Sequence, residues 1–198
     1  MDKRIRFHFA KRDRAIFLPH VELPAVFARA ARRAKIPLLY SEGFHPRPRV
    51  SLGPPLPMGV VALSEPGDLR VREWDSAMET MLREECPPGI DLLDAVPSEE
   101  KDLGKICSAG SYLLRERTPG VLERIREYLR EEEHREECRM LDFQENSDEL
   151  TFILDERRTG LGSLVKKCIA QELCAGWGDL FLLREAVGFI EEGCFCRV

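Results

Sequence analysis

The sequence predicts an α+β protein, because strand patterns and helix patterns alternate along its 198 residues. Apolar residues at every second position predict strands, and apolar residues spaced three and four apart predict helices. In the first half these patterns follow the order β-α-β-β-α-β, and the same order recurs in the second half. That order is the ferredoxin-like arrangement, so we expect two ferredoxin-like halves in tandem.

The first half opens with a strand and a helix that are clear from local periodicity. Residues 4–10 (RIRFHFA) alternate between apolar and polar side chains, which predicts a half-buried strand. Residues 21–35 carry apolar side chains at helical spacing, and Pro37 stops this helix. Further strands are expected at 38–40, 49–52, 68–73 and 90–95, and a second helix from 75 or 76 to 85.

A polar connector, residues 97–105 (PSEEKDLGK), separates the two halves. We therefore predict an N-terminal domain over residues 1–98 and a C-terminal domain over residues 106–198. No repeat of sequence joins them, so the duplication rests on element order alone. In the second half, strands are expected at 111–116, 138–144, 150–155 and 180–186, and helices at 120–133 and 164–174.

The net charge of −5 conceals a strong asymmetry. Residues 1–50 contain 12 Lys and Arg and 4 Asp and Glu, a net charge of +8, whereas the remaining residues hold 18 and 31, a net charge of −13. A basic region on an acidic chain predicts an anionic partner such as RNA, a nucleotide or an acidic protein. The alternative is that these charges only solvate surface helices and strands.

The cysteines indicate a reducing environment. There are seven, an odd number, and they are scattered along the chain. The first 14 residues lack the apolar core of a secretion signal, and no apolar run approaches the roughly 20 residues that span a bilayer. We therefore expect a cytoplasmic protein with free thiols and no membrane contact.

Residues 37–59, PLLYSEGFHPRPRVSLGPPLPMG, hold six of the thirteen prolines. Proline fixes its own φ, donates no backbone hydrogen bond and disfavours a helix at the preceding residue. We therefore expect a stiff, extended segment that presents aromatic, imidazole and guanidinium groups at defined spacing. Such pre-organisation is typical of a surface that binds something.

A recognisable pattern extends over the wider stretch FLPHVELPAVFARAARRAKIPLLYSEGFHPRPRVSLGPPLPMGV. It has a His-containing opening, an Arg-rich helix, Tyr-Ser-Gly-Phe-Pro-Arg elements and a Pro-Leu-Gly ending. It resembles the opening of the radical-SAM-linked protein family, a bacterial domain of unassigned role found beside or fused behind cobalamin-binding-type radical SAM proteins. Pro19 and Glu22 depart from the Ser and Asp of that pattern. The resemblance covers residues 15–68. Its matching positions are Phe17, Leu18, His20, Phe27, Arg29, Arg32, Arg33, Pro37, Tyr40, Ser41, Gly43, Phe44, Pro46, Pro48, Pro54, Leu56 and Gly59, with Glu65 and Asp68 as an acidic pair downstream.

This resemblance implies a radical SAM protein as partner and a connection with RNA modification. The chain itself lacks the C-x-x-x-C-x-x-C motif of radical SAM enzymes. We therefore expect a non-catalytic accessory protein with no cofactor.

The residues predict a basic binding surface in the first half. Arg29, Arg32 and Arg33 are spaced i, i+3 and i+4, so they share one face of the first helix. In an extended segment, Arg47 and Arg49 point to one side. Five converging guanidinium groups can bind phosphate.

Aromatic groups accompany these arginines. Tyr40, Phe44 and His45 can stack on the bases of single-stranded RNA. Ser41 lies among them and is included in the predicted binding site. An acidic protein partner is a second reading. A purely structural role is a third, in which Arg29 and Arg33 pair with Glu22 or with acids of the second half.

An enzymatic alternative uses His20, Tyr40 and His45. These groups could act as general acid and base on an RNA 2′-hydroxyl without a metal, as in CRISPR repeat-processing endonucleases of similar element order. His20 could instead cap the helix or hold the proline-rich segment by a hydrogen bond.

Cys194 and Cys196 form a C-x-C pair that could hold a metal. Tetrahedral sites usually take four ligands, and Cys168 and Cys174 complete no standard spacing. Structural thiols are the better interpretation.

Overall fold

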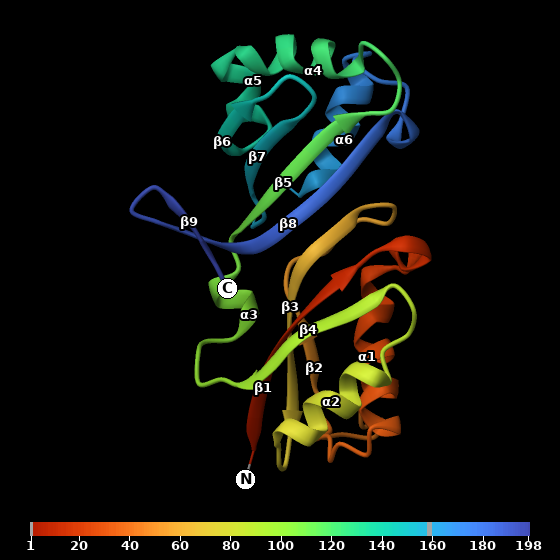
Figure 1. Ribbon diagram of the computed structural model, residues 1–198. Helices are drawn as coiled ribbons and strands as arrows, with labels where there is room; N and C mark the ends of the chain where they lie inside the picture. Colours follow the sequence, from red (N-terminus) through yellow and green to blue (C-terminus); the bar gives the residue numbers. More distant parts are fainter. Residues whose placement is uncertain (1, 158–159) are drawn as a thin grey trace.

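The computed structural model of the protein describes residues 2–157 and 160–198. Within this part of the chain, nine strands form one mixed sheet, accompanied by six α-helices (Figure 1). The prediction of an α+β fold is confirmed. None of the helices in the described ranges is both long and apolar enough to cross a membrane.

The first half forms the lower part of the molecule in Figure 1. Its strands pair in the order β4-β1-β3, with β2 on the outer side of β3, and all these pairs are antiparallel. Two short 3-10 helices, Asp13–Phe17 and His20–Glu22, connect β1 to α1. The elements are β1 (Lys3–Lys11), α1 (Leu23–Arg33), β2 (Val50–Leu52), β3 (Val61–Val71), α2 (Ser76–Glu84) and β4 (Ile90–Pro97).

The core of the first half follows from the alternation in β1. Ile5, Phe7 and Phe9 face α1, because side chains two residues apart lie on the same side of a strand. The rings of Phe7 and Phe9 lie 4.6 and 4.8 Å from that of Phe27 on α1. At α2, the Asp75 carboxylate accepts a hydrogen bond of 2.9 Å from the Met78 amide, as expected for a helix N-cap.

The second half repeats the element order with strands paired β8-β5-β7-β6, again antiparallel. The amphipathic helices α4 and α6 bury their apolar residues against these strands. A final short strand pairs with the end of β8. The elements are α3 (Leu103–Ile106), β5 (Ala109–Glu116), α4 (Val121–Arg130), α5 (Glu132–Glu137), β6 (Met140–Glu145), β7 (Leu150–Asp155), α6 (Leu161–Ala170), β8 (Leu180–Glu191) and β9 (Cys194–Arg197), with a 3-10 helix at Trp177–Asp179.

A short parallel pairing between β3 and β8 joins the halves into one sheet. Val61 lies opposite Leu183, and Ala62 lies opposite Arg184. Leu56, Val60 and Ala62 from the first half pack in the core of the second. Periodicity alone could not predict this pairing, since it joins residues about 120 positions apart.

Several expectations differ from the structure. Residues 38–40 form isolated bridges rather than a strand, the helix expected over 120–133 ends at Arg130, and the helix expected over 164–174 spans Leu161–Ala170. Strand β3 begins at Val61 rather than 68, although Pro66 and Gly67 resemble a turn. Gly67 is needed there because a Cβ would lie 2.2 Å from Phe7 Cζ. The connector is also not a loose linker, because its end forms α3 and Leu103 is buried with Cys107 and Val187.

Candidate nucleic-acid interface and buried ion cluster

The proline-rich segment contains a narrow hairpin, residues 39–49, called here the signature hairpin. The Ser41 amide donates to the Arg47 carbonyl at 2.8 Å, and the Arg49 amide donates to the Leu39 carbonyl at 2.8 Å. The Ser41 hydroxyl accepts a further bond of 3.0 Å from the Arg47 amide. Ser41 therefore holds the hairpin in shape.

The tip of the signature hairpin projects into solvent. The Phe44 side chain is fully exposed, at 102 % of its reference area, and His45 is exposed beside it. Gly43 turns the chain with a φ of +117°, a value that side chains other than glycine rarely adopt. Both faces of the Phe44 ring are therefore accessible to a ligand.

Arg32 connects the signature hairpin to α1. Its Nε donates to the Tyr40 hydroxyl at 3.3 Å, and its guanidinium lies 5.9 Å from the centre of the Tyr40 ring. Arg29 lies one turn earlier on α1 and is exposed, as is Arg47. Among the described residues, none of these three arginines has an ion-pair partner. Arg29, Arg32, Tyr40, Phe44 and Arg47 are called here the N-terminal basic surface.

The other two predicted arginines are engaged by acids. Arg33 Nε lies 2.5 Å from Glu85, and Arg49 lies 3.1 Å from Asp2. Arg33 was expected to pair with Glu22 or with acids of the second half, but it pairs with Glu85 instead. Both partners come from the first half, so three of the five guanidinium groups remain for a ligand.

The three residues of the enzymatic alternative are not brought together. His20 precedes α1, whereas Tyr40 lies beside Arg32 in its last turn and His45 is at the hairpin tip. An 11-residue helix is about 16 Å long at 1.5 Å per residue, so His20 lies far from the other two.

His20 instead holds the proline-rich segment, one of its predicted roles. Its Nδ1 accepts a hydrogen bond of 3.3 Å from the Leu56 amide. Burial, with the positive charges of Arg184 and Lys11, lowers the pKa of His20 to about 4. The ring is therefore neutral at physiological pH, as an acceptor must be.

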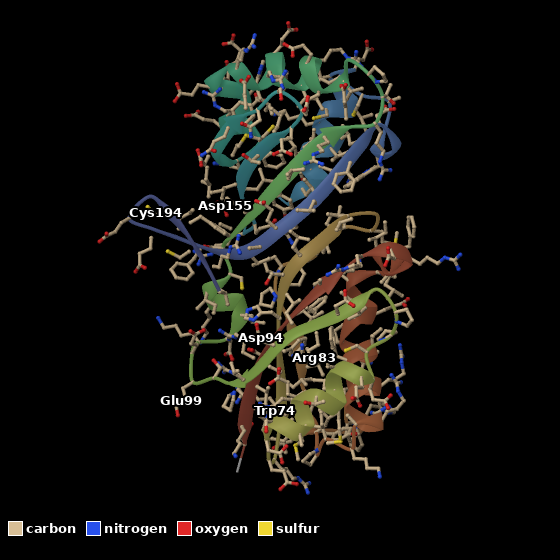
Figure 2. All side chains as sticks on the ribbon, in the orientation of Figure 1. Trp74, Arg83, Asp94, Glu99, Asp155 and Cys194 are labelled. Atoms are coloured by element: carbon tan, nitrogen blue, oxygen red, sulfur yellow. The ribbon has the colours of Figure 1, made fainter. Side chains whose placement is uncertain are left out.

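Cys194 and Cys196 lie on β9, in a hairpin that projects at the left of Figure 2, where Cys194 is labelled. Cys194 is exposed and Cys196 is half-buried. No group of three or more potential metal ligands occurs in residues 2–157 and 160–198. Cys168 and Cys174 are buried, and burial raises the pKa of Cys168 to about 12.

A buried ion cluster lies where the halves meet, and sequence analysis did not find it. Arg184 on β8 has no exposed side-chain area. Its Nε donates to Glu65 on β3 at 2.7 Å, and a second nitrogen donates to the other Glu65 oxygen. The carbonyls of Pro54 and Pro55 accept further bonds at 3.0 and 3.3 Å. The proline-rich segment therefore surrounds a buried cation.

Three further groups complete the buried ion cluster. The Tyr112 hydroxyl donates to Glu156, whose carboxylate lies 3.7 Å from Arg184. Burial raises the pKa of Glu156. The Lys11 ammonium donates to the Leu18 carbonyl at 2.8 Å, and its pKa falls to about 8 because of burial, which the attraction of Glu65 only partly offsets.

A sequence signal for this cluster did exist. Lys11 follows Ile5, Phe7 and Phe9 at the same two-residue period, so it occupies an inward-facing position of β1. Arg184 likewise lies two residues after the buried Leu182 and two before the buried Ala186 on β8. A charged residue at an inward position predicts a buried partner, because an unpaired buried charge is very costly.

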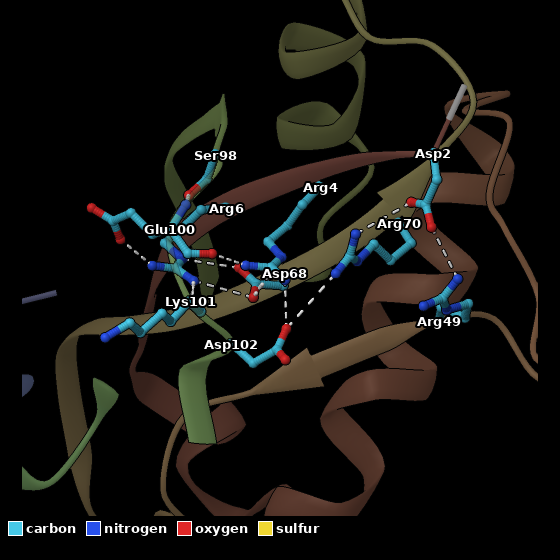
Figure 3. Close-up of polar contacts among 10 residues, drawn as sticks. All are labelled: Asp2, Arg4, Arg6, Arg49, Asp68, Arg70, Ser98, Glu100, Lys101 and Asp102. Atoms are coloured by element: carbon cyan, nitrogen blue, oxygen red, sulfur yellow. Dashed lines mark hydrogen bonds and ion pairs between the residues drawn. The ribbon is translucent and has the colours of Figure 1, made fainter. Parts of the chain in front are cut away.

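A second network of ion pairs lies on the face of the first-half sheet that points away from α1 (Figure 3). Asp68 is buried and lies 2.9 Å from Arg6 and 3.7 Å from Arg4. The acidic segment of residues 98–106, called here the strap, runs over these arginines: Asp102 lies 2.5 Å from Arg4, and Glu100 pairs with Arg6. The strap therefore neutralises the arginines of this face.

These features define an α+β protein whose two halves share a sheet, enclose a buried ion cluster and present a basic hairpin. The chain belongs to the bacterial family described as "Uncharacterized protein conserved in bacteria (DUF2344)", whose sequence pattern matches residues 4–157. The match runs from β1 to just beyond β7 and includes the signature hairpin. A search of curated proteins found no match to the chain.

Proposed function

We propose that this protein is a non-catalytic accessory protein of a radical SAM enzyme that binds single-stranded RNA through the N-terminal basic surface. The observation that carries the RNA part is the fully exposed Phe44 ring at the tip of a hairpin whose Arg47, like Arg32 in contact with Tyr40, has no acidic partner among the described residues. Aromatic faces and cations together are what single-stranded nucleic acids require of a protein.

Each part of this surface has a separate role in the proposal. Arg29, Arg32 and Arg47 provide the charge that attracts and positions phosphates. Phe44 provides a platform for a base, and His45 lies next to it. Stacking needs unpaired bases, so the proposal is for single strands rather than duplexes.

The rigidity of the surface favours binding over simple solvation. The cross-strand bonds at Ser41 and the contact between Arg32 and Tyr40 fix the hairpin before any ligand arrives. A pre-organised loop loses less conformational entropy on binding. A surface that only solvated the fold would not require this order.

The radical SAM partner is supported by the resemblance of residues 15–68 to the radical-SAM-linked family. Within the proposal, the protein delivers or orients an RNA substrate for that enzyme. The enzymatic alternative is less favoured, because His20 lies at the opposite end of α1 from Tyr40 and His45.

We also propose that each half is ferredoxin-like. The strand orders β4-β1-β3-β2 and β8-β5-β7-β6, each entirely antiparallel, support this assignment. An experimental structure that placed any of these strands elsewhere in the sheet would contradict it.

The test is a gel shift with labelled single-stranded RNA and with duplex RNA of the same sequence. In the test variant, Arg29, Arg32 and Arg47 are changed to Glu. The control changes Arg83, Arg115 and Arg130 to Glu, which alters the net charge equally but at arginines that already have acidic partners. We expect the first variant to lose single-strand binding and the control to retain it.

Equal binding by the two variants would contradict a role for this surface. A pull-down with the radical SAM protein tests the other part, because that interaction should survive RNase treatment. Absence of any interaction between the two proteins would overturn the accessory role and leave RNA binding to be judged on the gel shift.

A further inference from the structure

A cleft of about 230 Å³ opens where the two halves meet, away from the N-terminal basic surface. Phe17 and Met58 line it from the first half, and Arg117, Trp177 and Leu182 line it from the second. We call it the junction cleft. In Figure 1 the segment after β1 and the loop before β3 lie together on the right side of the junction.

The walls of the junction cleft are apolar yet open to water. The exposed fractions of Phe17, Met58 and Trp177 are 66, 57 and 36 %. Large apolar side chains gathered on one exposed patch usually mark a binding site. Phe17 lines the cleft from the first half and Trp177 from the second, so both can offer a ring to a flat ligand.

Arg117 adds a positive charge to this apolar site. Its guanidinium lies 5.8 Å from the centre of the Phe181 ring, within the range of a cation–π contact. In the part of the chain that the structure describes, Arg117 has no acidic partner. An arginine that is not paired with a carboxylate can bind an anionic group of a ligand.

The wall formed by the second half is rigid. The Asp179 carboxylate accepts hydrogen bonds of 2.7 Å from the Ala175 amide and 2.6 Å from the Thr118 hydroxyl. The Arg117 amide donates to the Asp179 carbonyl at 2.7 Å. Asp179 therefore fixes Trp177 and Arg117 relative to one another.

The opposite wall is also held in place. The Gly59 amide donates to the Ile16 carbonyl at 2.9 Å, which ties the loop carrying Met58 to the segment carrying Phe17. Gly59 has a φ of +82°, so this turn favours glycine.

We propose that the junction cleft binds one nucleotide, with its base between Phe17 and Trp177 and its phosphate at Arg117. A volume of about 230 Å³ is below the range of roughly 300–1,000 Å³ typical of sites for drug-sized ligands, so it suits a single ring system. The nucleotide is either free or an unpaired residue of an RNA strand, and in the second case the proposal rests on the proposed function.

The test uses the change in fluorescence of Trp177. The sequence has two tryptophans, so Trp74→Phe leaves Trp177 as the only reporter. Adenosine, guanosine, cytidine and uridine 5′-monophosphates are each titrated, together with their nucleosides. We expect saturable quenching and binding of the monophosphates at least tenfold tighter than that of the nucleosides, because a charge-assisted hydrogen bond is added.

Two pairs of variants make the result specific. Arg117→Ala should remove the advantage of the phosphate, whereas Arg115→Ala, two residues earlier near the end of β5 and paired with Glu149, should keep it. Phe17→Ala should weaken binding about tenfold through lost stacking. Val21→Ala, also highly exposed but outside the cleft, should not.

The source of the nucleotide is resolved by adding a single-stranded oligonucleotide. Quenching by the oligonucleotide that is lost in Phe17→Ala assigns the site to an RNA strand, and quenching by the monophosphates but not by the oligonucleotide assigns it to a free nucleotide. The Arg29, Arg32 and Arg47 variant should still bind monophosphate, so failure of the N-terminal basic surface is distinguishable. No saturable quenching at millimolar monophosphate, or identical binding by Arg117→Ala, would overturn the proposal.

Discussion

At the scale of single residues, Arg184 is the most constrained group in the protein. Its guanidinium is buried and is satisfied by Glu65 and by the carbonyls of Pro54 and Pro55. A buried ion pair contributes little net stability, but removal of one partner leaves an uncompensated charge. The cluster therefore specifies how the halves and the proline-rich segment fit together.

Replacement of Arg184 by Met should lower the free energy of unfolding by about 3–5 kcal/mol, because Glu65 would remain buried without its cation. Urea unfolding followed by circular dichroism measures the loss. The double variant Arg184→Met with Glu65→Gln should recover part of it. Arg115→Met, which removes an exposed pair with Glu149, should cost much less, and equal losses at the two arginines would contradict the argument.

His20 predicts a dependence of stability on pH. Its pKa is about 4 in the folded protein and about 6.5 when unfolded, so between these values only the unfolded chain takes up the proton. Stability should therefore fall as the pH decreases from 6.5 to 4. His20→Asn, which keeps an acceptor for the Leu56 amide, should reduce this fall by about 1–2 kcal/mol in urea unfolding at each pH.

The control for that measurement is His45→Gln, which changes an exposed histidine. It should leave the acid dependence as in the native sequence. A His20→Asn variant with an unchanged pH profile would show that the His20 ring is not held neutral in the folded protein.

At the scale of elements, the spacing of apolar residues predicted β1 and α1 correctly. β1 and α1 were expected from the spacing of Phe7, Phe9 and Phe27, and the structure places these three rings together. Residues 37–59 were expected to be extended because of their prolines; the structure has no helix there, but residues 39–49 fold back into the signature hairpin, which was not predicted. β1 and α1 could be predicted because their own residues specify them.

Elements that depend on distant partners were missed. The first part of β3 contains Pro66 and Gly67 and is a strand because β1, β2 and β8 pair with it. The strap was taken as a linker, yet its acids meet arginines of β1 that lie more than 90 residues away. The junction cleft could not be predicted either, since its two walls come from different halves.

Acids from the strap and from β3 pair with the same arginines but differ in burial, and the effect of this difference on stability can be measured. Asp68 is 3 % exposed and Asp102 is 61 % exposed. Asp68→Asn should cost about 3 kcal/mol in the free energy of unfolding, because Arg6 is buried with it. Asp102→Asn should cost about 1 kcal/mol or less, since water screens the pair. Equal costs would mean that burial does not decide the strength of this network.

At the scale of the whole molecule, the charge asymmetry of the sequence acquires a structural explanation. Many arginines of the basic region are neutralised within the fold, by Asp68 and the strap on one face and by Glu85 and Asp2 near the signature hairpin. In the described part of the chain, the arginines of the N-terminal basic surface keep their charge free for a partner, as do the exposed Lys3, Arg14 and Lys35. The net charge of +8 over residues 1–50 therefore overstates the surface that can meet an anion.

The parallel pairing of β3 with β8 joins the two halves that carry the proposed sites into one sheet. The N-terminal basic surface lies at the end of α1, and the junction cleft lies near its beginning, next to the segment that contains Phe17. A strand of a few nucleotides could therefore reach from one to the other. In the proposed function, the N-terminal basic surface provides most of the affinity for RNA.

The salt dependence of RNA affinity tests this role most directly. Fluorescence anisotropy of a labelled single-stranded RNA is measured from 50 to 300 mM KCl, for the native protein and for the variant with Arg29, Arg32 and Arg47 changed to Gln. Each phosphate contact on a single strand contributes about 0.7 to the slope of log affinity against log salt, so three contacts predict a slope that is shallower by about 2 in the variant. The same slope and affinity in both proteins would contradict RNA binding through this surface.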